Sequence, residues 1–173
     1  MILHCPSDRE AILKGTTYIN DVLEKIKSTG KYNITILLPA GNKNQTAYAN
    51  RVYAVSRYEL FRLYSKADIV IDQMITGWYG LQSIEALAAG KEVICYVNNN
   101  LKKYLFPGCP THLADINSLE NVLTGCIANI LRGKKTNPQK NLDWIKKYHT
   151  IESNNASLLE AWDISNNKSI EGK

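Results

Sequence analysis

The order of apolar and polar positions along the chain predicts alternating strands and helices. Short apolar runs rich in β-branched residues are typical of buried strands, and apolar residues spaced three and four apart are typical of helices with one buried face. The predicted strands cover residues 2–5, 34–38, 51–55, 69–71 and 93–97. The predicted helices cover residues 16–28, 59–66, 81–89, 118–131 and 141–162, the last with a break near His149.

This alternation predicts an α/β fold, a Rossmann-like doubly wound and mainly parallel sheet with helices on both faces. We expect one domain over residues 1–163, followed by a polar, disordered tail over residues 164–173. Ligands of such sheets bind beyond the carboxyl ends of the strands. The loops at which a ligand is expected are therefore residues 6–15, the turn before 55–58, and residues 76–81.

Composition is that of an ordinary globular domain. The chain has 173 residues, of which 45% are hydrophobic and 21% charged, which excludes a wholly disordered or fibrous protein. No apolar run is long enough to span a bilayer, and the first residues lack the layout of a secretion signal. We therefore expect a cytoplasmic protein with at most peripheral membrane contact.

The charge balance does not point to a nucleic-acid partner. Lys and Arg number 21 against 16 Asp and Glu, a net charge of +5. The cations gather only at residues 102–103, 132–135 and 146–147, a pattern more typical of solvated helix ends than of a basic face. A modest attraction to phosphorylated ligands or to an anionic membrane surface stays open.

The cysteines, histidines and acidic residues give no metal-binding pattern. Four cysteines show no metal-finger spacing, and no Asp-x-Asp pair occurs, so we expect no metal cofactor. Asp68 and Asp72 are interpreted as strand-end residues, and the histidines as structural. The cysteines are likewise interpreted as structural thiols. The cysteines and histidines concerned are Cys5, Cys95, Cys109, Cys126, His4, His112 and His149.

The first loop carries cations next to a predicted helix start. Arg9 lies a few residues before Lys14 and Gly15, where a helix N-terminus would offer free backbone amides. Together these groups would suit a diphosphate, although both side chains could equally be solvated. The glycine patterns of a Walker loop and of a dinucleotide-binding fold are missing, which argues against an oxidoreductase Rossmann domain.

The third loop combines glycines with a helix start. Gly77 and Gly80 would allow the backbone to approach a ligand, and the amides from Tyr79 to Leu81 would open the next helix. Glu85 follows one turn later among apolar and small residues. Sugar hydroxyls would serve as its donors, and a structural salt link is the alternative interpretation.

The sequence resembles a known enzyme family in several segments taken together. These segments are residues 3–9 with 14–16, residues 60–68, and residues 77–97. The sequence is similar to the nucleotide-sugar-binding C-terminal half of retaining glycosyltransferases of family four, which have the GT-B fold, over most of residues 1–162. The resemblance implies that Arg9 and Lys14 hold the donor diphosphate as catalytic residues. It implies donor-binding roles for Gly15, Val55 (through its backbone, to the nucleobase), Gly77, Tyr79, Gly80, Leu81 and Glu85 (to the ribose hydroxyls).

Two positions depart from the family pattern. The first glutamate of its Glu-x7-Glu motif falls on Gly77, which removes a carboxylate expected at the donor sugar, although Asp72 or Gln73 could reach the same space. Glu92 stands where the family has proline. These residues do not determine which sugar or which nucleobase the donor carries.

The resemblance implies an enzyme that transfers a hexose-type sugar from a nucleoside diphosphate to a glycan or lipid acceptor, with retention and without a metal. Enzymes of this type also have an N-terminal half, whereas this sequence starts at the first strand of the C-terminal half. We therefore expect a fragment or one subunit of a split enzyme, completed by an N-terminal-half partner chain. The alternative is a non-catalytic nucleotide-sugar-binding half, or a truncated remnant without activity.

Overall fold

Six parallel strands form one sheet in the computed structural model, which describes residues 1–5, 13–31, 36–39, 50–52 and 56–170. The strand order is β3-β2-β1-β4-β5-β6, and every neighbouring pair is parallel. The sheet therefore reverses its direction of winding between β1 and β4. The strands are β1 (Ile2–Leu3), β2 (Ile36–Pro39), β3 (Asn50–Val52), β4 (Ile69–Ile71), β5 (Glu92–Cys95) and β6 (His112–Leu113).

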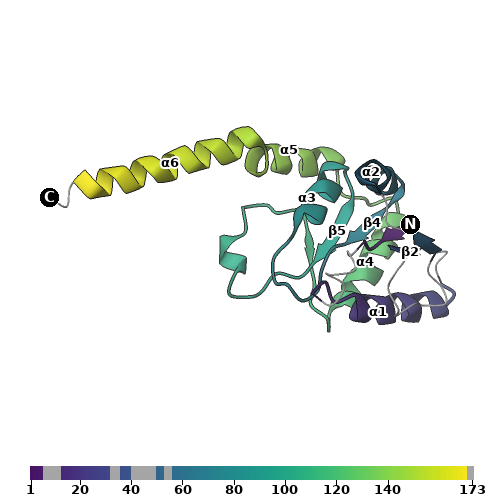
Figure 1. The fold of residues 1–173 in the computed structure, drawn as a ribbon. Coiled ribbons are helices and arrows are strands. Elements are labelled where there is room, and N and C mark those ends of the chain that lie inside the picture. The colour runs from purple at the N-terminus through teal and green to yellow at the C-terminus, as the bar shows by residue number, and fades with distance from the viewer. Residues whose placement is uncertain (6–12, 32–35, 40–49, 53–55, 171–173) are drawn as a thin grey trace.

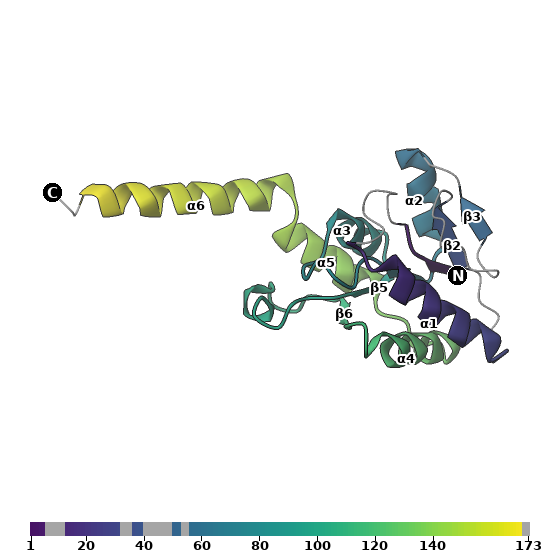
Figure 2. The ribbon, with the colours of Figure 1, turned by 60° about the horizontal axis from the view of Figure 1, so that its bottom comes forward.

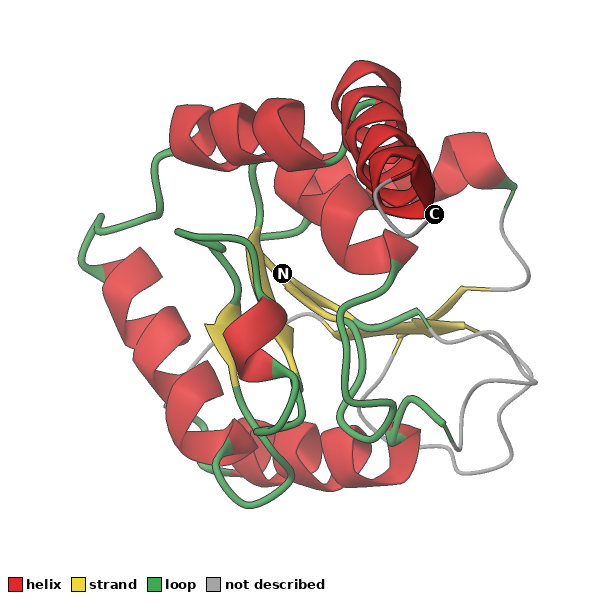
Figure 3. Ribbon diagram, turned by 90° about the vertical axis from the view of Figure 1, so that its left-hand side faces the viewer, coloured by secondary structure: helices red, strands yellow, loops and turns green. Residues whose placement is uncertain are grey.

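Helices cover both faces of this sheet, as Figure 3 shows. One layer is formed by α1 and α4, and the other by α2, α3 and α5. The doubly wound α/β fold predicted from the sequence is confirmed. The helices are α1 (Thr16–Ser28), α2 (Arg57–Lys66), α3 (Leu81–Ala88), α4 (Leu119–Leu131), α5 (Pro138–Tyr148) and α6 (Ile151–Ile170), with a 3-10 turn η1 at Lys102–Tyr104.

The buried strands separate two apolar layers because successive side chains point to opposite faces. Ile69 and Ile71 pack with α1 and α4, whereas Val70 between them packs with α2, α3 and α5. All three side chains are buried. This explains why β4 has no polar position although its neighbours along the chain are aspartates.

Two helix starts have clear local causes. Helix α1 covers the predicted residues, and it begins after Gly15, whose φ of +70° is in the left-handed region. Helix α2 begins at Arg57, two residues before the prediction, because Ser56 and Glu59 form a capping box. The Ser56 backbone amide donates to Glu59 Oε2 at 2.8 Å, and the Ser56 hydroxyl accepts from the Glu59 amide.

The C-terminal helices differ from expectation in their extent. The break near His149 is confirmed, because α5 ends at Tyr148 and α6 begins at Ile151. Helix α6 then continues to Ile170 and projects from the body of the molecule (Figures 1 and 2). It thus covers residues 164–170 of the expected tail, since extending a helix adds one hydrogen bond per residue once it has started. No helix in the described part of the chain is long and apolar enough to cross a membrane.

A partly buried ionic cluster lies beside β6, which is not among the strands predicted from the sequence. His112 Nε2 lies 2.6 Å from Glu92 Oε2, and the Thr136 hydroxyl donates to the same oxygen at 2.7 Å. Burial alone would raise the pKa of Glu92, but the hydrogen bonds from His112 and Thr136 lower it to about 2. Hydrogen bonds to Cys126 and Glu92 raise the pKa of His112 to about 10. A strand of two residues is too short for periodicity to predict.

Candidate functional site

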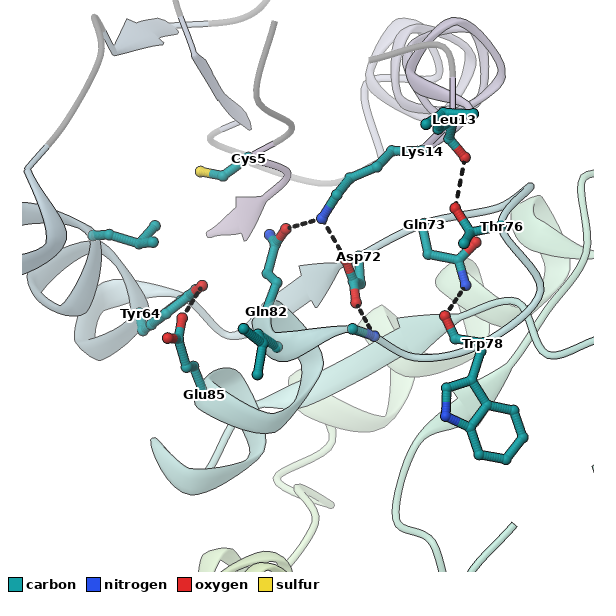
Figure 4. Close-up of a pocket in the computed structure, with 13 residues that line it drawn as sticks. Cys5, Leu13, Lys14, Tyr64, Asp72, Gln73, Thr76, Trp78, Gln82 and Glu85 are labelled. Atoms are coloured by element: carbon teal, nitrogen blue, oxygen red, sulfur yellow. Dashed lines mark hydrogen bonds and ion pairs between the residues drawn. The ribbon is translucent and has the colours of Figure 1, made fainter. Parts of the chain in front are cut away.

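A cavity of about 510 Å³ lies where the loops after β1 and β4 meet helices α2 and α3. This is the carboxyl edge of the sheet at the point where its winding reverses, the place where doubly wound folds bind ligands. Figure 4 shows the lining side chains. They are Cys5, Leu13, Lys14, Leu60, Tyr64, Asp72, Gln73, Thr76, Trp78, Gly80, Leu81, Gln82 and Glu85.

Lys14 is held in the wall of this cavity by two acceptors. Its ammonium donates to Asp72 Oδ1 at 2.7 Å and to Gln82 Oε1 at 2.9 Å. The Lys14 side chain is 16% exposed, and that of Asp72 is fully buried. An ammonium has three protons, so one of them is left to donate to a ligand.

Asp72 anchors the start of helix α3 as well as Lys14. Its Oδ2 accepts from the Gly80 amide at 3.0 Å and from the Ser83 hydroxyl at 2.7 Å. Burial would raise the pKa of Asp72, but the charge of Lys14 and these hydrogen bonds hold it below its usual value. The interpretation of Asp72 as a plain strand-end residue was therefore incomplete, because its carboxylate takes the helix N-terminal position at which an anion binds.

Glu85 lies one turn further along α3 and also lines the cavity. Its carboxylate accepts from Arg57 at 2.6 Å and from the Tyr64 hydroxyl at 3.3 Å. Arg57 is 73% exposed, whereas Glu85 is 18% exposed. Burial, together with the negative charge of Glu85, raises the pKa of Tyr64. The salt link considered as an alternative role is thus present, and it leaves the carboxylate in the cavity wall.

His4 supports the floor beneath these residues. It is fully buried, with Nδ1 2.9 Å from the Ile71 carbonyl oxygen and Nε2 2.9 Å from the Thr16 hydroxyl. Burial lowers the pKa of His4 to about 4, so the ring is neutral at pH 7. A carbonyl only accepts, so Nδ1 carries the proton and Nε2 accepts from Thr16. His4 thereby joins β1, β4 and α1, which confirms the structural role predicted for it.

In the loop from 73 to 80, Gly77 has a left-handed backbone conformation, which glycine adopts without strain. Gly77 has a φ of +87°, and a Cβ there would lie 3.3 Å from Asn98 Cβ. A glutamate at this position would need the left-handed backbone that side chains disfavour. The local backbone therefore favours glycine at position 77, and the absence of a carboxylate there follows from the conformation of this loop.

Several predicted donor-binding residues meet at the cavity, and others do not. Lys14, Gly80, Leu81 and Glu85 line it together. Arg9 and Val55 lie outside the described residues. Gly15, Gly77 and Tyr79 are not in the lining; Gly15 packs against Met74 and Ile75, and the Tyr79 ring stacks on Trp78 and meets the edges of Trp144 and His149.

Gln82, Tyr64 and Thr76 line the cavity, and Arg57 pairs with Glu85 from outside the lining, although none of these polar residues was predicted as a site residue from the sequence. Gln82 comes three residues before Glu85 on α3, so its polarity on a helix of small and apolar residues was an available signal. Arg57 had no such signal, because its partner lies 28 residues away. The charges also differ from expectation. Lys14 is the one cation in the described lining, against the carboxylates of Asp72 and Glu85, so this part of the site is not electropositive.

Comparisons with known proteins support the fold. No family model and no curated protein matches the sequence. Among solved structures, the chain is similar to sucrose-phosphate synthase from Thermosynechococcus elongatus, with a TM-score of 0.66 and 17% identity over 95% of this chain and 45% of that one. It is similar to the C-terminal domain of a glycosyl transferase group 1 family protein (LpcC) from Francisella tularensis, with a TM-score of 0.63 and 15% identity over 87% and 86%.

A third similar structure is described as a UDP-N-acetylglucosamine 2-epimerase from Listeria monocytogenes, with a TM-score of 0.56 and 13% identity over 87% of this chain and 45% of that one. The chain therefore spans less than half of two of these neighbours. At these identities the likeness shows the fold alone. That fold is glycosyltransferase-like, a Rossmann-like half of the GT-B architecture.

Proposed function

We propose that this chain is the donor-binding half of a glycosyltransferase, and that a nucleoside-diphosphate sugar binds in the cavity between α2 and α3. The sugar would be transferred to a glycan or lipid acceptor with retention of configuration and without a metal. The observation that carries the proposal is the position of Lys14 and Glu85 in the wall of one cavity at the reversal point of the sheet.

The two residues supply complementary chemistry. The third proton of the Lys14 ammonium suits a phosphoryl oxygen, and the Glu85 carboxylate suits the hydroxyls of a ribose. When the bond to the sugar breaks, negative charge develops on the diphosphate, and a fixed cation stabilises it. Because Asp72 balances the charge of Lys14, Arg9 is needed as the second cation of this proposal.

Titration of the chain with UDP, GDP and ADP tests the binding step. Lys14→Met should weaken the binding of the preferred nucleotide by roughly tenfold to a hundredfold, the usual range for a hydrogen bond to a charged group. Arg9→Ala should also weaken it, and Glu85→Gln should weaken binding of the nucleoside part. Lys25→Met is a matched control, because Lys25 pairs with Glu120 on the α1–α4 face, away from the cavity. Unchanged affinity in Lys14→Met would refute the assignment.

A second candidate function is nucleotide-sugar binding without turnover, by a half or subunit that needs a partner chain. It is favoured by the backbone at Gly77, which disfavours the carboxylate that the similar enzyme family places at the donor sugar. Release of the nucleoside diphosphate from a bound nucleotide sugar separates the two candidates. Transfer or hydrolysis by the chain, alone or mixed with an N-terminal-half partner, supports the enzyme, whereas binding without any release supports the binding subunit.

A further inference from the structure

The side-chain amide of Gln82 is a buried hydrogen-bond donor that has no acceptor. Gln82 is 8% exposed and lines the cavity at the start of α3. Its Nε2 atom makes no hydrogen bond in the described structure. Buried polar groups in folded proteins almost always have a partner, so an orphaned donor facing a cavity indicates a ligand acceptor.

The orientation of this amide is fixed by its neighbours. The Lys14 ammonium can only donate, so the atom 2.9 Å from it must be the Gln82 oxygen. Lys14 is in turn held by Asp72, which is fully buried. Nε2 is therefore directed away from Lys14, and Figure 4 shows it on the side of Cys5 and Tyr64, two other residues of the cavity lining.

A second buried glutamine in the same wall shows the contrast. The Gln73 amide donates to the Trp78 and Tyr96 carbonyl oxygens, which ties the loop after β4 to the end of β5. Gln73 thus has a structural role that satisfies its donors. Gln82 uses only its oxygen, and its two donor protons are left for a ligand.

The chemistry of the acceptor follows from the next turn of the helix. Residues three apart on a helix lie on the same face, so the Gln82 donor and the Glu85 acceptor are neighbours in the cavity wall. A phosphoryl oxygen would accept from Gln82 but would be repelled by Glu85. A hydroxyl satisfies both, because it accepts from the amide and donates to the carboxylate.

We propose that Gln82 is a specificity-determining residue that donates to a hydroxyl oxygen of the ligand's ribose, next to Glu85. This inference rests on the proposed function and adds to it a residue that distinguishes ribose from deoxyribose. Lys14 and Asp72 act as positioning residues for the Gln82 amide.

The test compares the preferred nucleotide among UDP, GDP and ADP with its 2′-deoxy and 3′-deoxy forms. The wild-type chain should bind at least one deoxy form roughly tenfold more weakly, and Gln82→Met should reduce that ratio by about three- to tenfold. Gln82→Glu keeps the oxygen that accepts from Lys14 and removes the donor, so it should reduce the ratio as well. If either variant keeps the wild-type ratio, the inference is wrong.

Thermal unfolding of the free chain distinguishes a binding role from a structural one. Gln82→Met removes an unsatisfied donor and the one hydrogen bond that Lys14 donates to the Gln82 oxygen, so it should lower Tm only slightly. Gln73→Met removes three hydrogen bonds and should lower Tm clearly more. An equal fall in Tm for both variants would make Gln82 structural and overturn the inference. If the wild-type chain binds none of the three nucleotides, the proposed function itself fails; binding without any change in Gln82→Met refutes this inference alone.

Discussion

His4 should make the stability of the chain depend on pH between about 5 and 6.5. The ring is fully buried and neutral, and its pKa in the folded protein is about 4, against an ordinary value of 6.5. Below pH 6.5 the unfolded chain therefore binds a proton that the folded chain rejects. Because the pKa of His4 is lower in the folded chain than in the unfolded chain, the contribution of His4 to the free energy of unfolding is fully present above pH 6.5 and decreases as the pH falls toward 4.

The size of the effect follows from the pKa difference. A difference of about 2.5 units corresponds to about 3 kcal/mol at 1.36 kcal/mol per unit, and about 2 kcal/mol of this is lost by pH 5. The other histidines act in opposite directions. His112 has a raised pKa, so its contribution to stability increases as the pH falls to about 6.5 and offsets part of the His4 effect between pH 7 and 6, whereas His149, whose pKa burial lowers, acts in the same direction as His4.

Urea unfolding at pH 7.0, 6.0 and 5.0 measures this dependence. Across the series the free energy of unfolding of the wild-type chain should fall by about 2 kcal/mol more than that of His4→Gln, in which residue 4 cannot titrate and His112 is unchanged. The range avoids the carboxylates, whose usual pKa values lie below 5. An equal pH dependence in the wild type and in His4→Gln would refute the reasoning, because it would assign the proton uptake to other groups.

Two further predictions concern stability. Gly77→Ala should lower the free energy of unfolding by about 1–2 kcal/mol, because the left-handed backbone and the 3.3 Å approach to Asn98 both disfavour a Cβ. The control is Gly125→Ala, in helix α4 with open space around it, which should raise Tm. A fall in Tm in both variants would contradict the prediction. Glu92→Gln should lower stability at pH 7 by about 2 kcal/mol, since it removes the charge paired with His112. Because the Glu92 pKa is depressed, the difference from wild type should shrink as the pH falls from 4.5 toward 2, and a difference that does not change with pH would disagree with this role.

The predictable parts of the fold are those governed by local pattern. Helix α1 and strand β4 match their predicted bounds, because a helical apolar face and an unbroken β-branched run are read within one segment. The start of α2 was missed by two residues because a capping box, not an apolar residue, begins the helix. Strand β6 has two residues and exists through its pairing with β5, which is a tertiary contact.

Some residues of the candidate site were predictable, but their pairing was not. Lys14 and Glu85 were identified from a helix start and from a carboxylate among small residues, and both line the cavity. The partner of Lys14 is 58 residues away, and that of Glu85 is 28 away. Sequence pattern gives the type of a side chain, whereas the identity of its counter-charge depends on how the strands are ordered in the sheet.

The ion pair between Lys14 and Asp72 also affects how a ligand is selected. Since the lysine charge is balanced within the protein, Lys14 itself exerts little long-range attraction on a diphosphate, and Lys14→Met should change the dependence of association on ionic strength only weakly. The lysine is also ordered before any ligand arrives, which removes much of the entropic cost of fixing a long side chain. Selection among equally charged nucleotides then depends on short-range contacts in the pocket.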